Sequence, residues 1–313
     1  MTNKNDIFSD ASAEGFVRRP IQGSIVALVT PFRDRGDAID LEAWRGLLDW
    51  HIESGTDAVV VAGTTGESAT LDASERDGLL TEAVRRCAGR CAVWAGTGAA
   101  STRVAVAQSQ RAAELGADAL LVVTPYYNRP PQRGLVAHYR AVAEATELPV
   151  VLYNVPSRTA VDLAPESVLE LAALPRIVAI KEAVPDMQRV RQYSAAGLTV
   201  LSGDDPSALE AMRNGAAGVV SVAANVVPAR MADLCRAARA GQIERAETLD
   251  AGLRALYRFL GSETNPLPVK WLLAEQKRIE PHLRLPLTTL DAVHHAAGRE
   301  LLARFSQLAS GRA

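Results

Sequence analysis

The sequence contains very little lysine. Of its 34 basic residues, only Lys4, Lys181, Lys270 and Lys277 are lysines, and all the others are arginines. A surface cation in this chain is therefore almost always an arginine, so a lysine within an apolar run calls for a chemical explanation. Lys181 is such a residue, because it directly follows the apolar run 177–180.

Other features are also scarce, and each absence excludes a class of protein. Three cysteines are too few for a disulfide framework, and neither they nor the five histidines show metal-site spacing. No apolar run reaches the roughly 18 residues that a membrane span needs. Residues 1–20 lack the apolar segment of a secretory signal, so we expect a cytoplasmic protein. A net charge of −2 without basic blocks argues against nucleic-acid binding.

Eight short apolar runs are spread along the chain, and their continuous hydrophobicity is typical of strands buried on both faces. They comprise Ser24–Thr30, Ala58–Ala62, Ala92–Ala95, Ala119–Thr124, Pro149–Tyr153, Ile177–Ile180, Thr199–Ser202 and Gly218–Val222. Segments of helical period lie between them, such as 41–54 and 102–115. Eight strand–helix units predict an α/β protein with a (β/α)₈ barrel.

The alternative fold is an open, doubly wound sheet, which would more naturally carry a Gly-x-Gly-x-x-Gly turn. The nearest segment, Gly96–Ser101, lacks the last glycine. We therefore predict a barrel over residues 23–226, an N-terminal extension over 1–22 whose order or disorder the sequence leaves open, and a C-terminal helical region over 227–313. The C-terminal region shows apolar helical spacing but no further strand signal.

Lysine differs from arginine in that its amine can lose a proton and attack a carbonyl. An amine in water is almost fully protonated at pH 7, and burial disfavours the charged form. Lys181 at the end of a buried strand is therefore a candidate nucleophile. The structural alternative is a lysine whose stem packs on the strand while its amine reaches water.

Polar segments follow five of the predicted strands. They are Gly63–Ser68, Pro125–Asn128, Tyr153–Thr159, Lys181–Ala183 and Ser202–Asp205. In a (β/α)₈ barrel these segments meet at the mouth formed by the carboxyl ends of the strands, where active sites lie. The sequence therefore predicts an active site at this mouth.

The residue types in these segments suit imine chemistry on a 2-oxo acid. Exposed amides and hydroxyls in Gly63–Ser68 can hold a carboxylate. Tyr153 and Tyr127 are phenols that can transfer protons while a carbinolamine loses water, and Thr64 can link them. Arg158 offers a two-pronged site for a second carboxylate. These groups indicate carbon–carbon bond formation or cleavage through an imine and its enamine.

The sequence resembles the pyruvate-dependent class I aldolase superfamily of N-acetylneuraminate lyase and dihydrodipicolinate synthase, from about Gly23 to Leu287. Gly63-Thr-Thr-Gly-Glu-Ser68 and the Lys181 strand are the superfamily features. The segment Tyr153-Asn-Val-Pro-Ser-Arg158-Thr is similar to the synthase branch in particular, as are 265–271 and 283–286.

The resemblance implies condensation of pyruvate with L-aspartate 4-semialdehyde to give 4-hydroxy-tetrahydrodipicolinate, in lysine and diaminopimelate biosynthesis. It implies a homotetramer built from tight dimers, without a metal or organic cofactor. The implied catalytic residues are Lys181 as Schiff-base lysine, Tyr153 as general acid and base, Thr64 as relay, and Tyr127, which would reach into the neighbouring subunit's site. The implied substrate-binding residues are Thr65 and Arg158 for the two carboxylates, and the backbone of Gly203 and Val220 around pyruvate.

The sequence departs from lysine-inhibited members of the family at the positions that would hold free lysine. The matching positions are Ala73, Ala100 and Val104, and Arg76 replaces a histidine found in some members, whereas Ser68, Ala69 and Tyr126 remain. Alanine and valine side chains cannot satisfy a buried ammonium or amino group. We therefore predict that lysine inhibits this protein weakly or not at all.

Two other functions stay open at the level of sequence. A sister aldolase could use the same lysine on another 2-oxo acid, such as a 2-keto-3-deoxy sugar acid, but Arg158 favours a short acidic aldehyde. A catalytically silent barrel could bind a metabolite and regulate a partner. The presence of both Lys181 and Tyr153 argues against that function.

Overall fold

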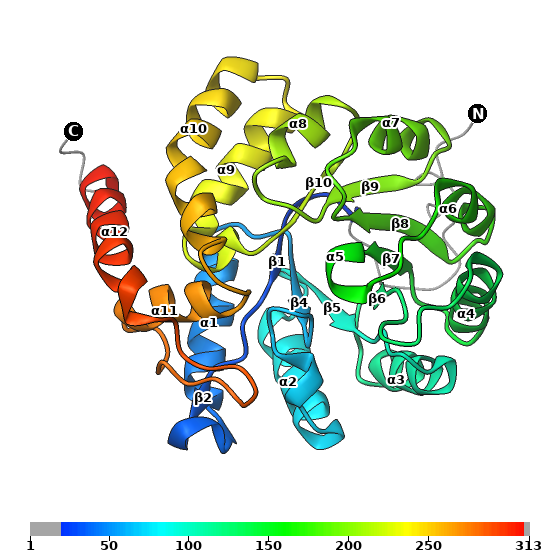
Figure 1. Cartoon of the computed structure of the whole chain (residues 1–313), viewed down its shortest axis with the longest axis horizontal. Coiled ribbons are helices and arrows are strands. Elements are labelled where there is room, and N and C mark those ends of the chain that lie inside the picture. The colour runs from blue at the N-terminus through cyan, green and yellow to red at the C-terminus, as the bar shows by residue number, and fades with distance from the viewer. Residues whose placement is uncertain (1–19, 310–313) are drawn as a thin grey trace.

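The predicted (β/α)₈ barrel is confirmed. The computed structural model describes residues 20–309, with side chains described up to residue 305. Eight parallel strands close into a barrel in the order β1-β10-β9-β8-β7-β6-β5-β4 (Figure 1). The predicted N-terminal extension falls largely on residues 1–19, which lie outside the described residues.

The barrel strands lie where the apolar runs predicted them, within a few residues. Their bounds are β1 Gly23–Ala27, β4 Ala58–Val61, β5 Ala92–Gly96, β6 Ala119–Val123, β7 Val150–Asn154, β8 Ile177–Glu182, β9 Thr199–Ser202 and β10 Gly218–Ser221. The first strand ends at Ala27 rather than at Thr30, although residues 28–30 are also buried.

One pair of strands was not predicted. β2 Phe32–Arg33 and β3 Ala38–Ile39 form a small antiparallel hairpin between β1 and the first helix. Two residues per strand are too few to show an alternating pattern. Phe32 is fully buried, so the hairpin anchors this connection in the core.

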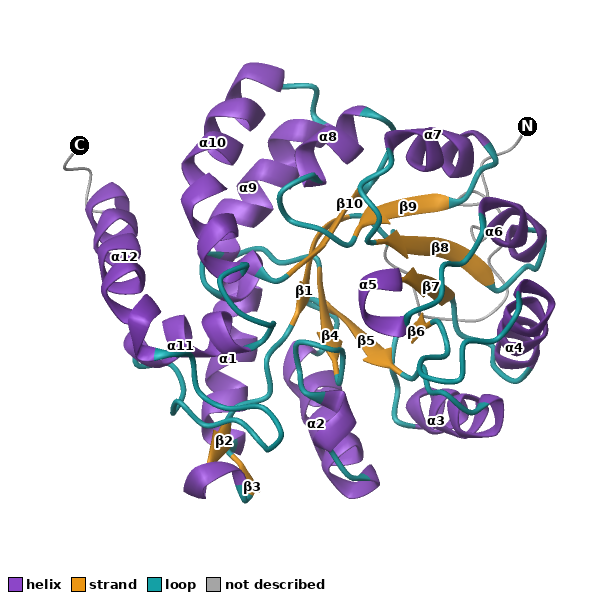
Figure 2. Ribbon diagram, in the orientation of Figure 1, coloured by secondary structure: helices purple, strands orange, loops and turns teal. Residues whose placement is uncertain are grey.

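Helices surround the strands on the outside (Figure 2). Between the strands lie α1 Leu41–Glu53, α2 Ala73–Cys87, α3 Thr102–Glu114, α4 Gln132–Glu144, α5 Pro156–Thr159, α6 Pro165–Ala172, α7 Met187–Ala195 and α8 Ala208–Arg213. The start of α2 shows how local sequence sets these bounds. The Asp72 side chain accepts a hydrogen bond from the Glu75 N–H, and the Glu75 carboxylate accepts one from the Asp72 N–H.

The apolar side chains form two cores, one on each face of the barrel wall. The inner core fills the barrel with residues such as Ile25, Val60, Val151 and Leu201. The outer core packs the strands against the helices and holds larger residues, such as Trp44. Both faces of each strand are therefore buried, which explains the continuous apolar runs in the sequence.

The C-terminal region is helical, as predicted. It contains α9 Pro228–Arg239, α10 Ile243–Leu260, α11 Leu267–Glu275 and α12 His295–Ala309. These helices lie together at one side of the barrel, next to α1 (yellow to red in Figure 1). β10 ends at Ser221 and α9 begins at Pro228, and the predicted division at 226/227 falls between them.

Candidate active site

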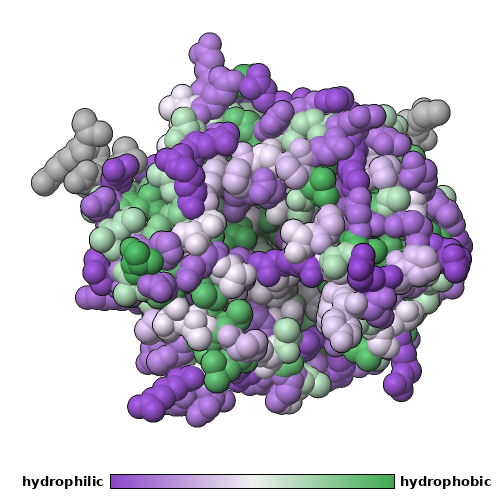
Figure 3. Space-filling model, in the orientation of Figure 1, coloured by the Kyte–Doolittle hydropathy of each residue, from purple (hydrophilic) through white to green (hydrophobic). Residues whose placement is uncertain are grey.

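Four of the five polar segments that follow the strands contribute to one cavity, whereas Pro125–Asn128 does not line it. Its volume is about 240 Å³, and its lining includes Thr64, Thr65, Tyr153, Arg158, Lys181 and Gly203. The lining residues come from the carboxyl ends of the eight barrel strands and the loops that follow them, together with Asn265 from the C-terminal region. Helix α5 lies near the centre of the view in Figure 1, and Figure 3 shows that this face of the molecule is hollowed near its centre.

Lys181 lies inside the barrel wall next to a phenol. The residue is only 5% exposed, and its amine lies 4.0 Å from the centroid of the Tyr153 ring. The two residues are register partners on β8 and β7, so the strand pairing itself places them side by side. The alternative of an amine that reaches water does not fit this burial. A buried amine beside a phenol that can exchange protons has the arrangement that imine formation needs.

The backbone of Gly203 leaves room for the stem of this lysine. A Cβ atom added at Gly203 would lie 3.1 Å from Lys181 Cε and 2.9 Å from Ala183 Cβ. Real Cβ atoms rarely come so close to other carbons, so a larger residue would displace the lysine or the end of β8. A glycine at this position therefore permits the observed placement of the amine.

The loop after β4 presents two threonines to the cavity. The amides of Gly66 and Ser68 both donate to the Gly63 carbonyl oxygen, which folds the loop into a compact turn. The Thr30 hydroxyl donates to the Gly66 carbonyl oxygen at 2.7 Å and holds the turn against the first strand. Thr65 is almost fully buried within this turn. Its hydroxyl and the neighbouring amides can hold a carboxylate.

Asn265 also lines the cavity, and sequence reasoning gave it no role. Its side-chain amide donates to the Thr65 hydroxyl at 2.9 Å, although it lies in the C-terminal region, 200 residues away. The Arg158 guanidinium donates to the Asn265 carbonyl oxygen at 3.3 Å. Asn265 thus connects the loop after β4 to the arginine.

A buried ion pair supports the loop after β4, residues 63–68, which we call the threonine loop. The Lys270 amine lies 2.6 Å from a carboxylate oxygen of Glu67, and both side chains are fully buried. Burial lowers the pKa of Lys270 to about 8, and the Glu67 carboxylate opposes that shift. Glu67 has a left-handed backbone conformation, with φ of 55°. The ion pair therefore holds the loop and α11 together at a position of backbone strain.

Arg158 lies on the short helix α5, and its side chain is exposed at the cavity. Within the described residues, no carboxylate lies within ion-pair distance of its guanidinium. Its charge is therefore available for an acidic ligand.

Two predicted site residues do not line the cavity. Tyr127 follows β6 and is 93% exposed, with its side chain in solvent. Val220 lies within β10 and belongs to the inner core, whereas Val222 lines the cavity. The roles predicted for these two residues stay predictions.

Comparison with known proteins assigns the family. A family model described as the dihydrodipicolinate synthetase family matches residues 20–304. The chain belongs to this family. A relative from Alcanivorax borkumensis, named 4-hydroxy-tetrahydrodipicolinate synthase, is 47% identical over 90% of this chain and 97% of its own. A relative of the same name from Acidithiobacillus ferrooxidans is 50% identical over 90% and 98%.

Solved structures of dihydrodipicolinate synthases share the fold. The chloride-inhibited synthase from Acinetobacter baumannii, in complex with pyruvate, gives a TM-score of 0.88 at 45% identity. The synthase from Aquifex aeolicus gives 0.89 at 44%. Each comparison covers 91% of this chain and 98% of the other chain. The predicted family membership is therefore confirmed.

Residues 20–309 contain neither a metal-ligand cluster nor a membrane-spanning helix. No group of three or more potential metal-ligating side chains comes together. No helix combines the length and the apolarity needed to cross a bilayer. Cys87, Cys91 and Cys235 are buried free thiols.

Proposed function

We propose that this protein is a 4-hydroxy-tetrahydrodipicolinate synthase, which condenses pyruvate with L-aspartate 4-semialdehyde through a Schiff base on Lys181. The observation that carries this proposal is the buried Lys181 amine, 4.0 Å from the Tyr153 ring centroid in a cavity with two threonines and a free arginine. Close relatives of the chain bear the name of this enzyme.

The first half of the reaction forms the imine. Thr65 and the amides of its loop hold the pyruvate carboxylate, and the Lys181 amine attacks the keto carbon to give a carbinolamine. Tyr153 donates the proton with which the hydroxyl leaves as water. The resulting imine loses a proton from the methyl carbon to Tyr153 and becomes an enamine. Thr64 passes protons between Tyr153 and Tyr127 of the partner subunit.

The second half forms the carbon–carbon bond. The enamine carbon attacks the aldehyde carbon of the semialdehyde, and the aldehyde oxygen takes up a proton, which leaves an imine on Lys181. The amino group of the semialdehyde then attacks the imine carbon, which closes the ring and releases the Lys181 amine and the product. Arg158 holds the carboxylate of the semialdehyde through charge-assisted hydrogen bonds. The backbone of Gly203 and Val220 forms part of the pyruvate pocket. Each step uses side chains of the protein, and no metal or organic cofactor is expected.

Tyr127 points to an oligomer. A phenol that is 93% exposed cannot serve the cavity of its own subunit, because it does not line that cavity. We propose that it completes the site of a neighbouring subunit in a cytoplasmic homotetramer built from tight dimers. A single subunit would then be a poor catalyst even when folded.

Covalent trapping tests the proposal. Pyruvate and borohydride should add one reduced pyruvate adduct to the intact mass, and peptide mapping should place it on Lys181. K181R should abolish both the adduct and turnover with little change in fold, because a guanidinium does not form the imine. An adduct on another residue, or more than a few per cent of residual turnover, would contradict the assignment.

A substrate panel separates this synthase from a sister aldolase. Pyruvate with aspartate semialdehyde should be turned over, whereas 2-keto-3-deoxy sugar acids should not be cleaved. Cleavage of a sugar acid at a comparable rate would favour the sister enzyme. Absence of any adduct would favour a silent binding barrel.

A further inference from the structure

A buried polar network lies behind the catalytic strand pair and has no part in the reaction steps above. Asn154 and Glu182 are the next register partners after Tyr153 and Lys181 on β7 and β8. Side chains alternate between the two faces of a strand. Tyr153 and Lys181 face the cavity, so Asn154 and Glu182 face the layer between the strands and the helices. Asn154 is fully buried, and Glu182 is 3% exposed.

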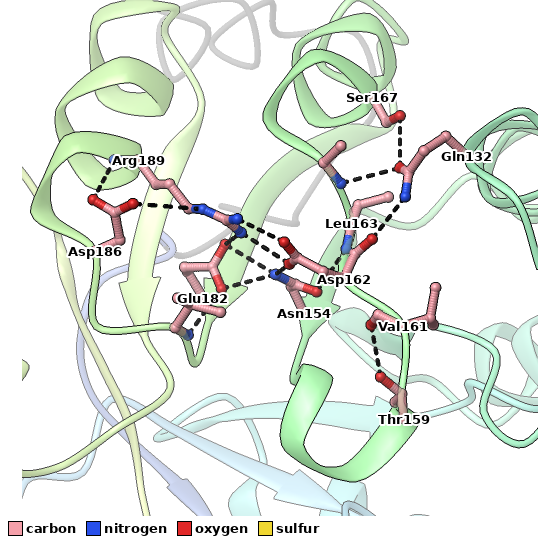
Figure 4. Close-up of polar contacts among 12 residues, drawn as sticks. Gln132, Asn154, Thr159, Val161, Asp162, Leu163, Ser167, Glu182, Asp186 and Arg189 are labelled. Carbon is pink, nitrogen blue, oxygen red and sulfur yellow. Dashed lines mark hydrogen bonds and ion pairs between the residues drawn. The ribbon is translucent and has the colours of Figure 1, made fainter. Parts of the chain in front are cut away.

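The two side chains bond directly across the strands (Figure 4). The Asn154 amide donates to both carboxylate oxygens of Glu182, at 3.0 and 3.2 Å. The Val184 N–H donates to the same carboxylate at 3.0 Å. The side-chain oxygen of Asn154 accepts a hydrogen bond from the Leu163 N–H at 3.0 Å. Two backbone amides beyond the strand ends are thus tied to one side-chain pair.

One arginine from α7 closes the network. The Arg189 guanidinium donates to both oxygens of Asp162, at 2.9 and 2.6 Å, and lies 3.7 Å from Glu182 and 3.8 Å from Asp186. Asn154 also donates to Asp162 at 2.8 Å. A single guanidinium therefore faces three carboxylates.

The network also reaches the segment that follows Arg158. Asp162 and Leu163 lie directly after α5, and the Gln132 side chain holds the backbone of this segment by donating to the Asp162 carbonyl oxygen and accepting from the Ala164 N–H. The same network therefore fixes the ends of β7 and β8 and the segment that follows α5, the helix that carries Arg158.

We propose that Glu182 is a positioning residue, which together with Asn154 holds the Lys181 amine against Tyr153 and holds the Arg158 loop at the cavity. This inference rests on the proposed function. It assigns a task to a buried carboxylate that touches neither substrate in the proposed reaction. A shift of about 1 Å in a reacting group can reduce turnover about 100-fold.

Burial and the nearby Asp162 raise the pKa of Glu182 to about 7, whereas its hydrogen-bond donors and Arg189 favour the carboxylate form. All its hydrogen-bond partners are donors, Asn154 and the Val184 amide, and Arg189 lies nearby. The other titratable groups that interact with it or with Arg189 are Asp162, Asp186, Tyr139 and Tyr193. An amide in place of this carboxylate would turn an NH₂ group toward the Asn154 NH₂ group.

Exchanging the amide donor at position 154 with the carboxylate acceptor at position 182 tests the proposal. E182Q opposes two amide NH₂ groups, and N154D opposes two carboxylates. The double variant N154D/E182Q restores one donor facing one acceptor between the two strands at unchanged net charge, while its new carboxylate also faces Asp162, which accepts from the Asn154 amide in the wild type. The control is E170Q, which removes the exposed pair of Glu170 with Arg140 on α6 and α4. Circular dichroism and melting temperature establish folding, and E182D, which keeps the charge, serves if E182Q does not fold.

The folded single variants should lose about 10- to 100-fold in kcat and in the rate of borohydride trapping, with KM for pyruvate changed less than about threefold. The double variant should recover at least about fivefold of that loss, and the control should match the wild type. Single variants that fold and trap pyruvate at the wild-type rate would overturn the positioning role. A wild-type protein that traps no pyruvate would instead overturn the proposed function itself.

Discussion

Breaking the buried ion pair below the threonine loop should cost much of the stability of the protein. K270M removes the amine and leaves the Glu67 carboxylate in a site where both side chains are fully buried. Removing one partner of such a pair costs about 3–5 kcal/mol, because the remaining charge has lost both water and its counter-ion. With an unfolding entropy of about 2.1 cal/mol/K per residue over 313 residues, that loss lowers the melting temperature by about 5–8 °C.

The double variant E67Q/K270M isolates the cause. Its neutral amide keeps an oxygen for the Arg284 N–H, which donates to Glu67 at 3.1 Å. It should therefore melt above K270M and recover more than half of the loss. R213M removes an exposed ion pair with Glu247 and should shift the melting temperature by less than about 2 °C.

Scanning calorimetry at one fixed protein concentration compares the wild type with the three variants, because association of subunits would otherwise change the melting temperature. K270M should also show a raised KM for pyruvate, since the ion pair holds the loop with Thr65, whereas R213M should not. A K270M protein that melts within about 2 °C of the wild type would refute the assumption that an uncompensated charge remains buried.

Three further predictions concern pH, the second substrate and regulation. Burial lowers the pKa of His51 to about 3, so only the unfolded chain gains a proton near pH 5, and stability falls by about 2 kcal/mol from pH 7.5 to pH 5. H51Q should shrink this difference, measured as the change in melting temperature. R158A should raise KM for the semialdehyde about 10- to 100-fold, with unchanged pyruvate trapping; equal loss of both would make the arginine structural. Lysine should not inhibit at submillimolar concentration in a steady-state assay, because Ala73 and Val104 offer it no polar partner.

The barrel could be predicted because each strand is buried on both faces and so appears as an unbroken apolar run. The site could be predicted because polar residues at strand ends share one mouth in this fold. The arginine-rich composition added a separate signal, because it made Lys181 an exception. These signals are local in the sequence and need no knowledge of packing.

The rest depends on contacts between distant segments. Asn265 reaches Thr65 from the C-terminal region, which is not part of the strand–helix pattern. Lys270 pairs with Glu67 across a similar separation in the chain. Glu182 lies next to Lys181 in sequence but faces the other side of the strand, and a strand end alone does not tell which polar residue has a buried partner.

The scarcity of lysine gives this protein an unusual reactivity toward amine-directed compounds. Lys270 is fully buried in its ion pair, and Lys277 lies on the outside of the molecule. Aldehydes and keto acids small enough for a cavity of about 240 Å³ would meet only one enclosed amine there. Screening small carbonyl fragments by intact mass, with Lys4 and Lys277 replaced by arginine and peptide mapping to separate Lys181 from the N-terminal amine, would then report on occupancy of the cavity.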